Sequence, residues 1–289
     1  MLNYAAVKNW NFEPVVQTYT QRDCMLYALG LNIGADPMDR GQLRYVYEKD
    51  LKTIPTMATV LGSPGFWWRD PGTGVDWVKL VHGEQAIRVF KPLPAAATVV
   101  AQNRVMSITD KGAGKGVIVV IKREIREQGS GELLAEVVHG TFLRGDGGYS
   151  AGTGQSDPGP AALPAPPDGP AALEVALASM EQQALIYRLS GDYNTLHADP
   201  DIAAAAGFAR PILHGLCTYG MALHAVLRAV TEYDSSRIRA FAVRFTSPVY
   251  PGETVRFELW PRDSSSFHLR AHVDARNVVV LNNGLVELY

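Results

Sequence analysis

The second half of the chain combines one long apolar helix with several alternating stretches that predict strands. Apolar residues recur at helical spacing between positions 213 and 233, at Leu216, Leu223, Leu227 and Val230. Beyond this helix, alternation of apolar and polar residues predicts strands at 238–246, 254–261 and 267–274, and a fourth strand from position 278 onward. A helix followed by antiparallel strands is the α+β pattern in which a sheet wraps around a helix.

The stretch that precedes the long helix predicts a strand, a loop and two short helices. We expect a strand over 181–189 that enters a loop at Ser190-Gly191-Asp192. Positions 194–197 predict a single helical turn, with Asn194 as its N-cap. Asp199-Pro200 suits the N-cap and first position of a second short helix.

The two halves of the chain resemble each other. Ile87-Arg88-Val89 and Pro92 match Val243-Arg244-Phe245 and Pro248, at a constant offset of 156 residues. The apolar stretch Thr56 to Leu61 predicts the start of a first-half counterpart to the long helix. We interpret the halves as a duplicated α+β unit. Two such units can join their sheets at one edge, which removes a bare strand edge.

A segment rich in glycine and proline divides the halves. Positions 145–172 hold 7 Gly and 6 Pro among 28 residues. No regular element tolerates that density of chain breakers, so we expect a mobile linker. The predicted organisation is a unit at 1–144, the linker at 145–172 and a second unit at 173–289.

Composition and charge exclude several classes of protein. Hydrophobic residues make up 47% of the 289 and charged residues only 19%, which excludes a disordered chain. The net charge is −2, and the longest basic stretch, 122–126, contains glutamate and is expected to end a strand, so we expect no nucleic-acid partner. No apolar run reaches 18 residues and the N-terminus lacks a signal-peptide pattern, so we expect a cytoplasmic protein without a membrane partner. Cys24 and Cys217 are too few for a disulfide framework or a tetrahedral zinc site and are expected to be reduced core residues.

The stretch from Tyr187 to His197 carries the clearest chemistry. It places a carboxylate, an amide and an imidazole at Asp192, Asn194 and His197. With Asp192 in a loop and His197 in the following turn, both side chains can converge on one water molecule as an acid–base pair. The alternative interpretation is a capped surface turn with a solvated Asp and His.

A second candidate feature begins the long helix. In Arg210-Pro211-Ile-Leu-His214-Gly215, free backbone N–H groups form a positive pole that suits a developing oxyanion, and Gly215 leaves room for a carbonyl oxygen. The alternative is an ordinary helix start that His214 caps.

Together these motifs resemble the hydratase-2 motif of the MaoC-like family. The matching pattern is Gly-Asp-x-Asn-x-Leu-His followed by Pro-x-Leu-His-Gly. Three first-half stretches, at 19–30, 51–56 and 82–85, are similar to the two-hotdog, eukaryotic-type hydratase 2. The resemblance implies a double hotdog fold, in which two helix-and-sheet units join their sheets edge to edge, with the catalytic unit second and a non-catalytic acyl-pocket unit first. Phe66-Trp67-Trp68 could line that pocket or belong to the core.

The resemblance also implies roles for individual residues. Asp192 and His197 would form the catalytic dyad, Asn194 would orient substrate or water, and the N–H of Gly215 would hold the thioester oxygen. Substrate-binding roles fall to Tyr187, His214 and, from the first half, Glu84; an exposed Glu at a strand edge is the other interpretation of Glu84. The family usually has Pro at position 195, where this chain has Thr, so a looser turn with intact chemistry is expected.

The implied activity is reversible syn hydration of trans-2-enoyl-CoA to (3R)-3-hydroxyacyl-CoA. No metal or other cofactor is expected beyond the coenzyme A thioester itself. Three alternatives stay open: a dehydratase acting on a specialised acyl-CoA or acyl-carrier-protein intermediate, a hotdog thioesterase, and a non-catalytic acyl-binding module. The family implies a homodimer.

Overall fold

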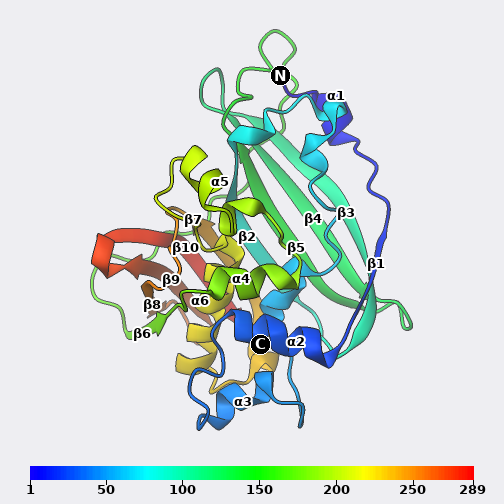
Figure 1. The fold of residues 1–289 in the computed structure, drawn as a ribbon. Coiled ribbons are helices and arrows are strands. Elements are labelled where there is room, and N and C mark those ends of the chain that lie inside the picture. The colour runs from blue at the N-terminus through cyan, green and yellow to red at the C-terminus, as the bar shows by residue number, and fades with distance from the viewer.

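The computed structural model describes all 289 residues and forms a single ten-stranded antiparallel sheet (Figure 1). The strand order is β1-β3-β4-β5-β2-β7-β10-β9-β8-β6. Strands β1–β5 come from the first half and β6–β10 from the second. Their bounds are Val15–Tyr19, Leu80–Val89, Ala97–Asp110, Val117–Glu127, Leu133–Leu143, Leu173–Ala178, Ile238–Phe245, Thr254–Pro261, Ser266–Val273 and Val278–Leu288.

The two halves meet where β2 pairs with β7. Ala86 faces Ala242 in this antiparallel pair, and the two positions are 156 residues apart. Because the offset of the sequence repeat is also 156, Ala86 and Ala242 are equivalent positions that lie opposite each other, and the other pairs are arranged symmetrically about them. A local two-fold axis therefore passes between Ala86 and Ala242, and the expected joining of the sheets at an edge is confirmed.

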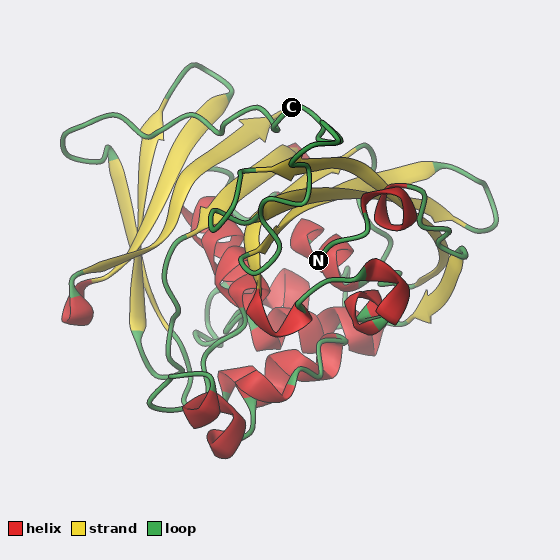
Figure 2. Cartoon of the chain, turned by 90° about the horizontal axis from the view of Figure 1, so that it is seen from above, coloured by secondary structure: helices red, strands yellow, loops and turns green.

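The helices lie on the concave side of the curved sheet (Figure 2). The longest, α6 at Gly215–Ala229, is buried from Cys217 to Leu227 and forms the axis of the second unit. Gly220 makes room for a first-half side chain, because a Cβ there would lie 2.4 Å from Cδ2 of Leu31. The other helices are α1 at Tyr4–Lys8, α2 at Gln21–Gly30, α3 at Arg40–Val46, α4 at Gln183–Tyr187 and α5 at Pro200–Ala205. None of them is long and apolar enough to cross a bilayer.

The long helix predicted to start at Thr56–Leu61 in the first half is wrong. The structure has a short 3₁₀ helix, η1, at Pro55–Val60 instead. The chain turns away at Gly62, whose φ of 62° suits glycine and whose missing Cβ would clash with Ala101. Trp68, one of the aromatic residues that follow, is buried with Leu2 and Val7 in a small second core.

The strand predicted at 181–189 is also wrong, because these residues form α4 and a 3₁₀ turn, η5, at Arg188–Ser190. The apolar side chains of Ala184 and Tyr187, three positions apart, are buried on one helical face. Short apolar runs fit a strand or a helix equally well, and packing against α2 decides in favour of the helix.

The segment 145–172 contains no helix or strand, and side chains from both halves bind it. The Asp157 carboxylate accepts hydrogen bonds from Lys8 Nζ and the backbone N–H of Ile108. The carbonyl oxygen of Leu163 accepts a bond from Asn283 Nδ2 in the second unit. The segment thus runs against both units, and the three-part division of the chain stays a prediction.

Candidate active site

The loop before η6, the 3₁₀ turn at Thr195–His197, presents Asp192 and His197 on the same side of the chain. Asn194 caps this turn as predicted, because its Oδ1 accepts the N–H of Leu196 at 3.1 Å. One carboxylate oxygen of Asp192 accepts the N–H of Asn194 at 3.2 Å. Asn194 therefore fixes the geometry of both the turn and the carboxylate.

His197 is buried in a defined tautomer. Its Nδ1–H donates to the carbonyl oxygen of Ile212 at 2.8 Å, which leaves Nε2 with a free lone pair. Burial lowers the pKa of His197 below its usual value, although the Ile212 carbonyl and Asp192 act in the opposite direction. The side chain is thus neutral near pH 7, as a general base requires.

His214 packs directly against His197. The two imidazole rings stack with centroids 3.7 Å apart and planes 27° apart. His214 Nε2–H donates to the carbonyl oxygen of Asp192 at 3.1 Å, so this ring also ties down the Asp192 loop. Burial and the neighbouring His197 lower the pKa of His214 to about 4, so it too is neutral.

The structure brings Asp192, His197 and His214 into one cluster. One carboxylate oxygen and one nitrogen from each ring all lie within 4.8 Å of one another. These residue types could ligate a metal ion. However, stacked, nearly parallel rings aim their nitrogen lone pairs side by side, and one nitrogen of each ring already hydrogen-bonds a backbone carbonyl. The arrangement fits acid–base chemistry better than a tetrahedral metal site.

Helix α6 begins beside this cluster at Gly215, with His214 as its N-cap residue. The N–H groups of Gly215 and Leu216 have no backbone acceptor, and the helix dipole adds positive potential there. The Phe245 ring covers Gly215, since a Cβ at this position would lie 3.3 Å from Cε1 of that ring. The site therefore has room for an oxygen atom at the helix terminus but little room for a side chain.

Tyr187 lies behind His214 and is fully buried. Its ring centroid is 5.0 Å from that of His214 and 5.8 Å from that of Tyr27 on α2. Neither tyrosine hydroxyl has a hydrogen-bond partner. This position suits support of the His214 ring, and the substrate-binding role expected of Tyr187 stays a prediction.

The structure does not bring Glu84 into the cluster. Its carboxylate pairs with Arg244 across the β2–β7 junction, where Oε1 accepts bonds of 2.9 and 2.7 Å from Nε and Nη2. On β2, Gln85, Ile87 and Val89 are the buried residues, so Glu84 points to the other face. Because β2 pairs with both β5 and β7, the half-buried Glu84 does not lie at a sheet edge either, and its substrate-binding role stays a prediction.

Two residues near the site were missed by sequence reasoning. His82 on β2 contacts the Phe245 ring at a centroid distance of 4.8 Å. Burial lowers the pKa of His82 to about 4, and the negative charge of Asp192 acts in the opposite direction. Tyr27 reaches the back of the site from α2. Both come from the first half, far from Asp192 in sequence, and only the family-like stretches at 19–30 and 82–85, which contain them, could have pointed to them.

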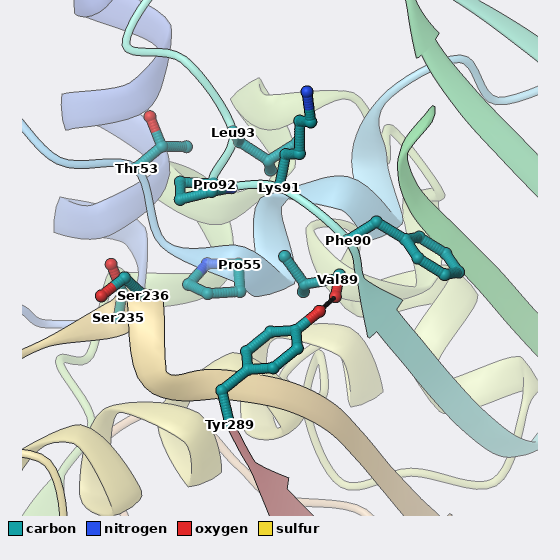
Figure 3. Close-up of a pocket in the computed structure, with 10 residues that line it drawn as sticks. All are labelled: Thr53, Pro55, Val89, Phe90, Lys91, Pro92, Leu93, Ser235, Ser236 and Tyr289. Atoms are coloured by element: carbon teal, nitrogen blue, oxygen red, sulfur yellow. Dashed lines mark hydrogen bonds between the residues drawn. The ribbon is translucent and has the colours of Figure 1, made fainter. Parts of the chain in front are cut away.

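Neither of the two best-formed cavities contains the cluster. One, of about 20 Å³, lies among Thr53, Pro55, Val89 and Tyr289 (Figure 3). It also touches Ser235 and Ser236, beyond the C-terminal end of α6. The 15-residue helix is about 22 Å long at 1.5 Å per residue, so this cavity is remote from the chemistry. The other, of about 180 Å³, opens at the junction of β2 and β7.

Two family models match this chain. The family described as MaoC like domain matches residues 162–283, and the MFE-2 hydratase 2 N-terminal domain matches residues 17–145. The 3-hydroxyacyl-thioester dehydratase Y of Mycobacterium tuberculosis is 39% identical over 95% of this chain and 94% of its own length. The mouse peroxisomal multifunctional enzyme type 2 is 36% identical over 94% of this chain, which spans only 36% of that enzyme.

Solved structures show the same fold. A MaoC-like dehydratase from Phytophthora capsici superposes with a TM-score of 0.86 and 31% identity, covering 100% of this chain and 99% of its own. A Mycobacterium tuberculosis protein described as a double hotdog superposes at 0.54 with 14% identity, over 97% of this chain and 94% of its own, and supports the fold alone. The predicted double hotdog is confirmed. This chain belongs to the MaoC-like family, in the form that joins a hydratase 2 N-terminal domain to a MaoC-like domain.

Proposed function

We propose that this chain catalyses the reversible syn hydration of trans-2-enoyl-CoA to (3R)-3-hydroxyacyl-CoA. The observation that carries the proposal is the meeting of Asp192 with a neutral His197, whose Nε2 is free, beside the N-terminus of α6. The names of the relatives, an enzyme acting on 3-hydroxyacyl thioesters and a multifunctional enzyme, agree with it. Because the equilibrium runs both ways, dehydration of a 3-hydroxyacyl thioester, including a specialised acyl-CoA or carrier-protein intermediate, uses the same site.

The helix terminus supplies the electrostatic part of the mechanism. When water adds to C3 of a conjugated enoyl thioester, enolate charge develops on the thioester oxygen. The N–H of Gly215 donates to this oxygen, and the positive pole of α6 stabilises its charge. Removal of a single donor of this kind elsewhere costs about 3–4 kcal/mol in the transition state.

The two side chains move the proton. His197 Nε2 accepts a proton from water as the water oxygen bonds to C3, and the resulting imidazolium returns the proton to C2. The Asp192 carboxylate accepts a hydrogen bond from the other O–H of the water, whose hydrogen stays on the product hydroxyl, and it stabilises the imidazolium. Because water and proton approach from one side, addition is syn. Asn194 and His214 act by holding Asp192 in place.

The proposal also includes four expectations that the geometry does not test: the cofactor requirement, the role of the first half, the cellular location and the oligomeric state. The chemistry needs no metal or redox cofactor, since the dyad and the helix terminus supply proton transfer and charge stabilisation. The first half is proposed as the acyl-pocket domain. The cytoplasmic location stays a prediction, and one named relative is peroxisomal. The homodimer also stays a prediction, which sedimentation of the purified chain would test.

Hydration of trans-2-enoyl-CoA, followed as loss of the enoyl-thioester absorbance, tests the proposal. We expect Asp192→Asn and His197→Ala each to lower kcat by orders of magnitude. The matched controls are Asp201→Asn, on the exposed first turn of α5, and His268→Ala on β9, and neither should change the rate. Turnover that persists in both dyad variants would refute the mechanism. Release of free thiol without loss of the enoyl band would indicate a thioesterase.

A further inference from the structure

The concave face of the first-half sheet carries a band of polar side chains between the two apolar cores. Strand pairing places these side chains on neighbouring strands β2, β5, β4 and β3. Most members of the band are buried, which is unusual for so many polar groups in one layer. The band consists of Gln85, Asn103, Arg123, His139 and Thr141.

Arg123 is the only positively charged member, and it has no carboxylate partner. The residue is 4% exposed. Its Nε donates to Asn103 Oδ1 at 3.0 Å, and Nη1 donates to the carbonyl oxygens of Thr59 and Leu61 at 3.1 and 2.7 Å. Its Nη2 has no acceptor in the chain. Burial lowers the pKa of Arg123 to about 10, so the guanidinium is still charged at neutral pH.

A line of aromatic rings connects Arg123 to the active site. Phe245, which covers Gly215, contacts His82, and the His82 ring lies 5.8 Å from that of His139. His139 pairs with Ile121 on β4, so Arg123 is its diagonal neighbour on the same face. His82 and His139 stay partly accessible, whereas their neighbours Gln85 and Ile121 are buried. The two imidazoles therefore lie between the Phe245 ring beside Gly215 and the Arg123 guanidinium.

We propose that the acyl cleft of this chain accepts an acyl group with a carboxylate at the end remote from the thioester, and that Arg123 binds this carboxylate. The inference rests on the hydratase function proposed above and names its substrate class. A buried charge without a counter-ion is costly, and a substrate carboxylate on Nη2 would supply the missing anion. The neutral rings of His82 and His139 offer contact surface to the intervening carbon chain. Arg123 is then a specificity-determining residue that takes no part in proton transfer.

The test compares wild-type enzyme on three matched series of trans-2-enoyl-CoA thioesters, with a methyl, a carboxamide or a carboxylate at the far end. Each series covers short, medium and long chains. A charge-assisted hydrogen bond predicts a kcat/KM about ten-fold to a hundred-fold higher for the carboxylate than for the carboxamide, at the chain length that reaches Arg123. No preference for the carboxylate at any length would overturn the proposal. Failure of every series to react would instead refute the hydratase function.

Variants of Arg123 locate the preference. Arg123→Met should abolish the carboxylate-to-carboxamide ratio, whereas Arg123→Lys, which keeps the charge, should retain most of it. Arg123 also hydrogen-bonds the backbone of η1, so Arg123→Met could fail to fold. In that case the substrate comparison in the wild type and in the Lys variant decides whether the enzyme prefers the carboxylate. A ratio that survives in a folded Met variant would show that another group binds the carboxylate.

Discussion

Protonation of the buried His224 should make the fold sensitive to mild acid. His224 lies in the middle of α6, remote from Asp192 along the helix, and is 3% exposed. Its Nε2 lies 3.2 Å from the hydroxyl of Tyr233, while Nδ1 has no partner. Burial lowers the pKa of His224 to about 4, from a value of about 6.5 in an unfolded chain.

The size of the effect follows from these two pKa values. Between pH 6.5 and pH 4 the unfolded chain binds a proton at His224 and the folded chain does not, so the free energy of unfolding falls as the pH falls. At pH 5.5 about nine-tenths of the unfolded chains carry the proton, which costs about 1.4 kcal/mol relative to pH 7.5. Buried His214, whose pKa is also lowered to about 4, doubles the loss. Against a typical stability of about 5–15 kcal/mol, that is a large fraction.

Urea unfolding of wild type and His224→Phe, at pH 7.5 and pH 5.5, measures this contribution. Phenylalanine fills a similar volume and cannot bind a proton. We expect the wild type to lose about 1.4 kcal/mol more than the variant between the two pH values. Each protein serves as its own reference, so any packing effect of the substitution cancels. Equal losses in both proteins would mean that His224 is not held neutral by the fold, and the reasoning from burial would be refuted.

Four further predictions concern the site. Because the pKa of His197 is lowered, kcat/KM should be constant near neutral pH and should decline only when the pH falls below the usual pKa range of histidine. A decline that already begins above pH 7 as the pH is lowered would contradict the role of His197 as a neutral base. Gly215→Ala should lower kcat, since the new methyl group would lie 3.3 Å from the Phe245 ring, and the added substitution Phe245→Leu should restore part of the rate. An unchanged kcat in the single variant would show that this crowding does not occur. Thr195→Pro should raise the free energy of unfolding by about 0.4–1 kcal/mol, because position 195 is the first residue of its turn, where proline fits and restricts the unfolded chain. A lower Tm in thermal unfolding would show that proline is strained there. Glu84→Gln should lower the free energy of unfolding by less than about 1 kcal/mol and leave kcat/KM unchanged. A loss of activity without a loss of stability would show that Glu84 takes part in substrate binding.

The strands and the dyad could be predicted because each depends on short-range pattern. The strand at Thr254–Pro261 has its predicted bounds, since alternation along a half-buried strand fixes both its face and its ends. Asp192, Asn194 and His197 lie within six residues, so the local turn alone brings them together. These parts of the structure need no information from the rest of the chain.

The remaining parts depend on contacts between distant segments. Whether residues 181–189 form a strand or a helix is decided by packing on α2, which the local sequence does not specify. His82 and Arg123 lie on one face near the site because of the register of the first-half sheet. Glu84 was placed at the site by motif similarity, but strand alternation turns it to the opposite face, toward Arg244. In each case the missing information is tertiary.

The loss of symmetry between the two units explains why one of them performs the chemistry. At the repeat offset of 156, the positions equivalent to Gly215–Ala229 are 59–73, and these contain Gly62, Pro64, Gly65 and Pro71. Such a stretch cannot continue as one helix, so the first unit has only short 3₁₀ helices here: η1, η2 at Trp67–Arg69 and η3 at Pro71–Thr73. Without a long helix the first unit has no matching helix terminus for an oxyanion. Arg123 can hold the carbonyls of η1 there because the end of a short helix, and not its middle, faces the sheet. The departure of the first unit from the repeat thus leaves α6 as the one long helix whose N-terminus can face an oxyanion, and it leaves the Arg123 guanidinium bonded to backbone carbonyls of η1.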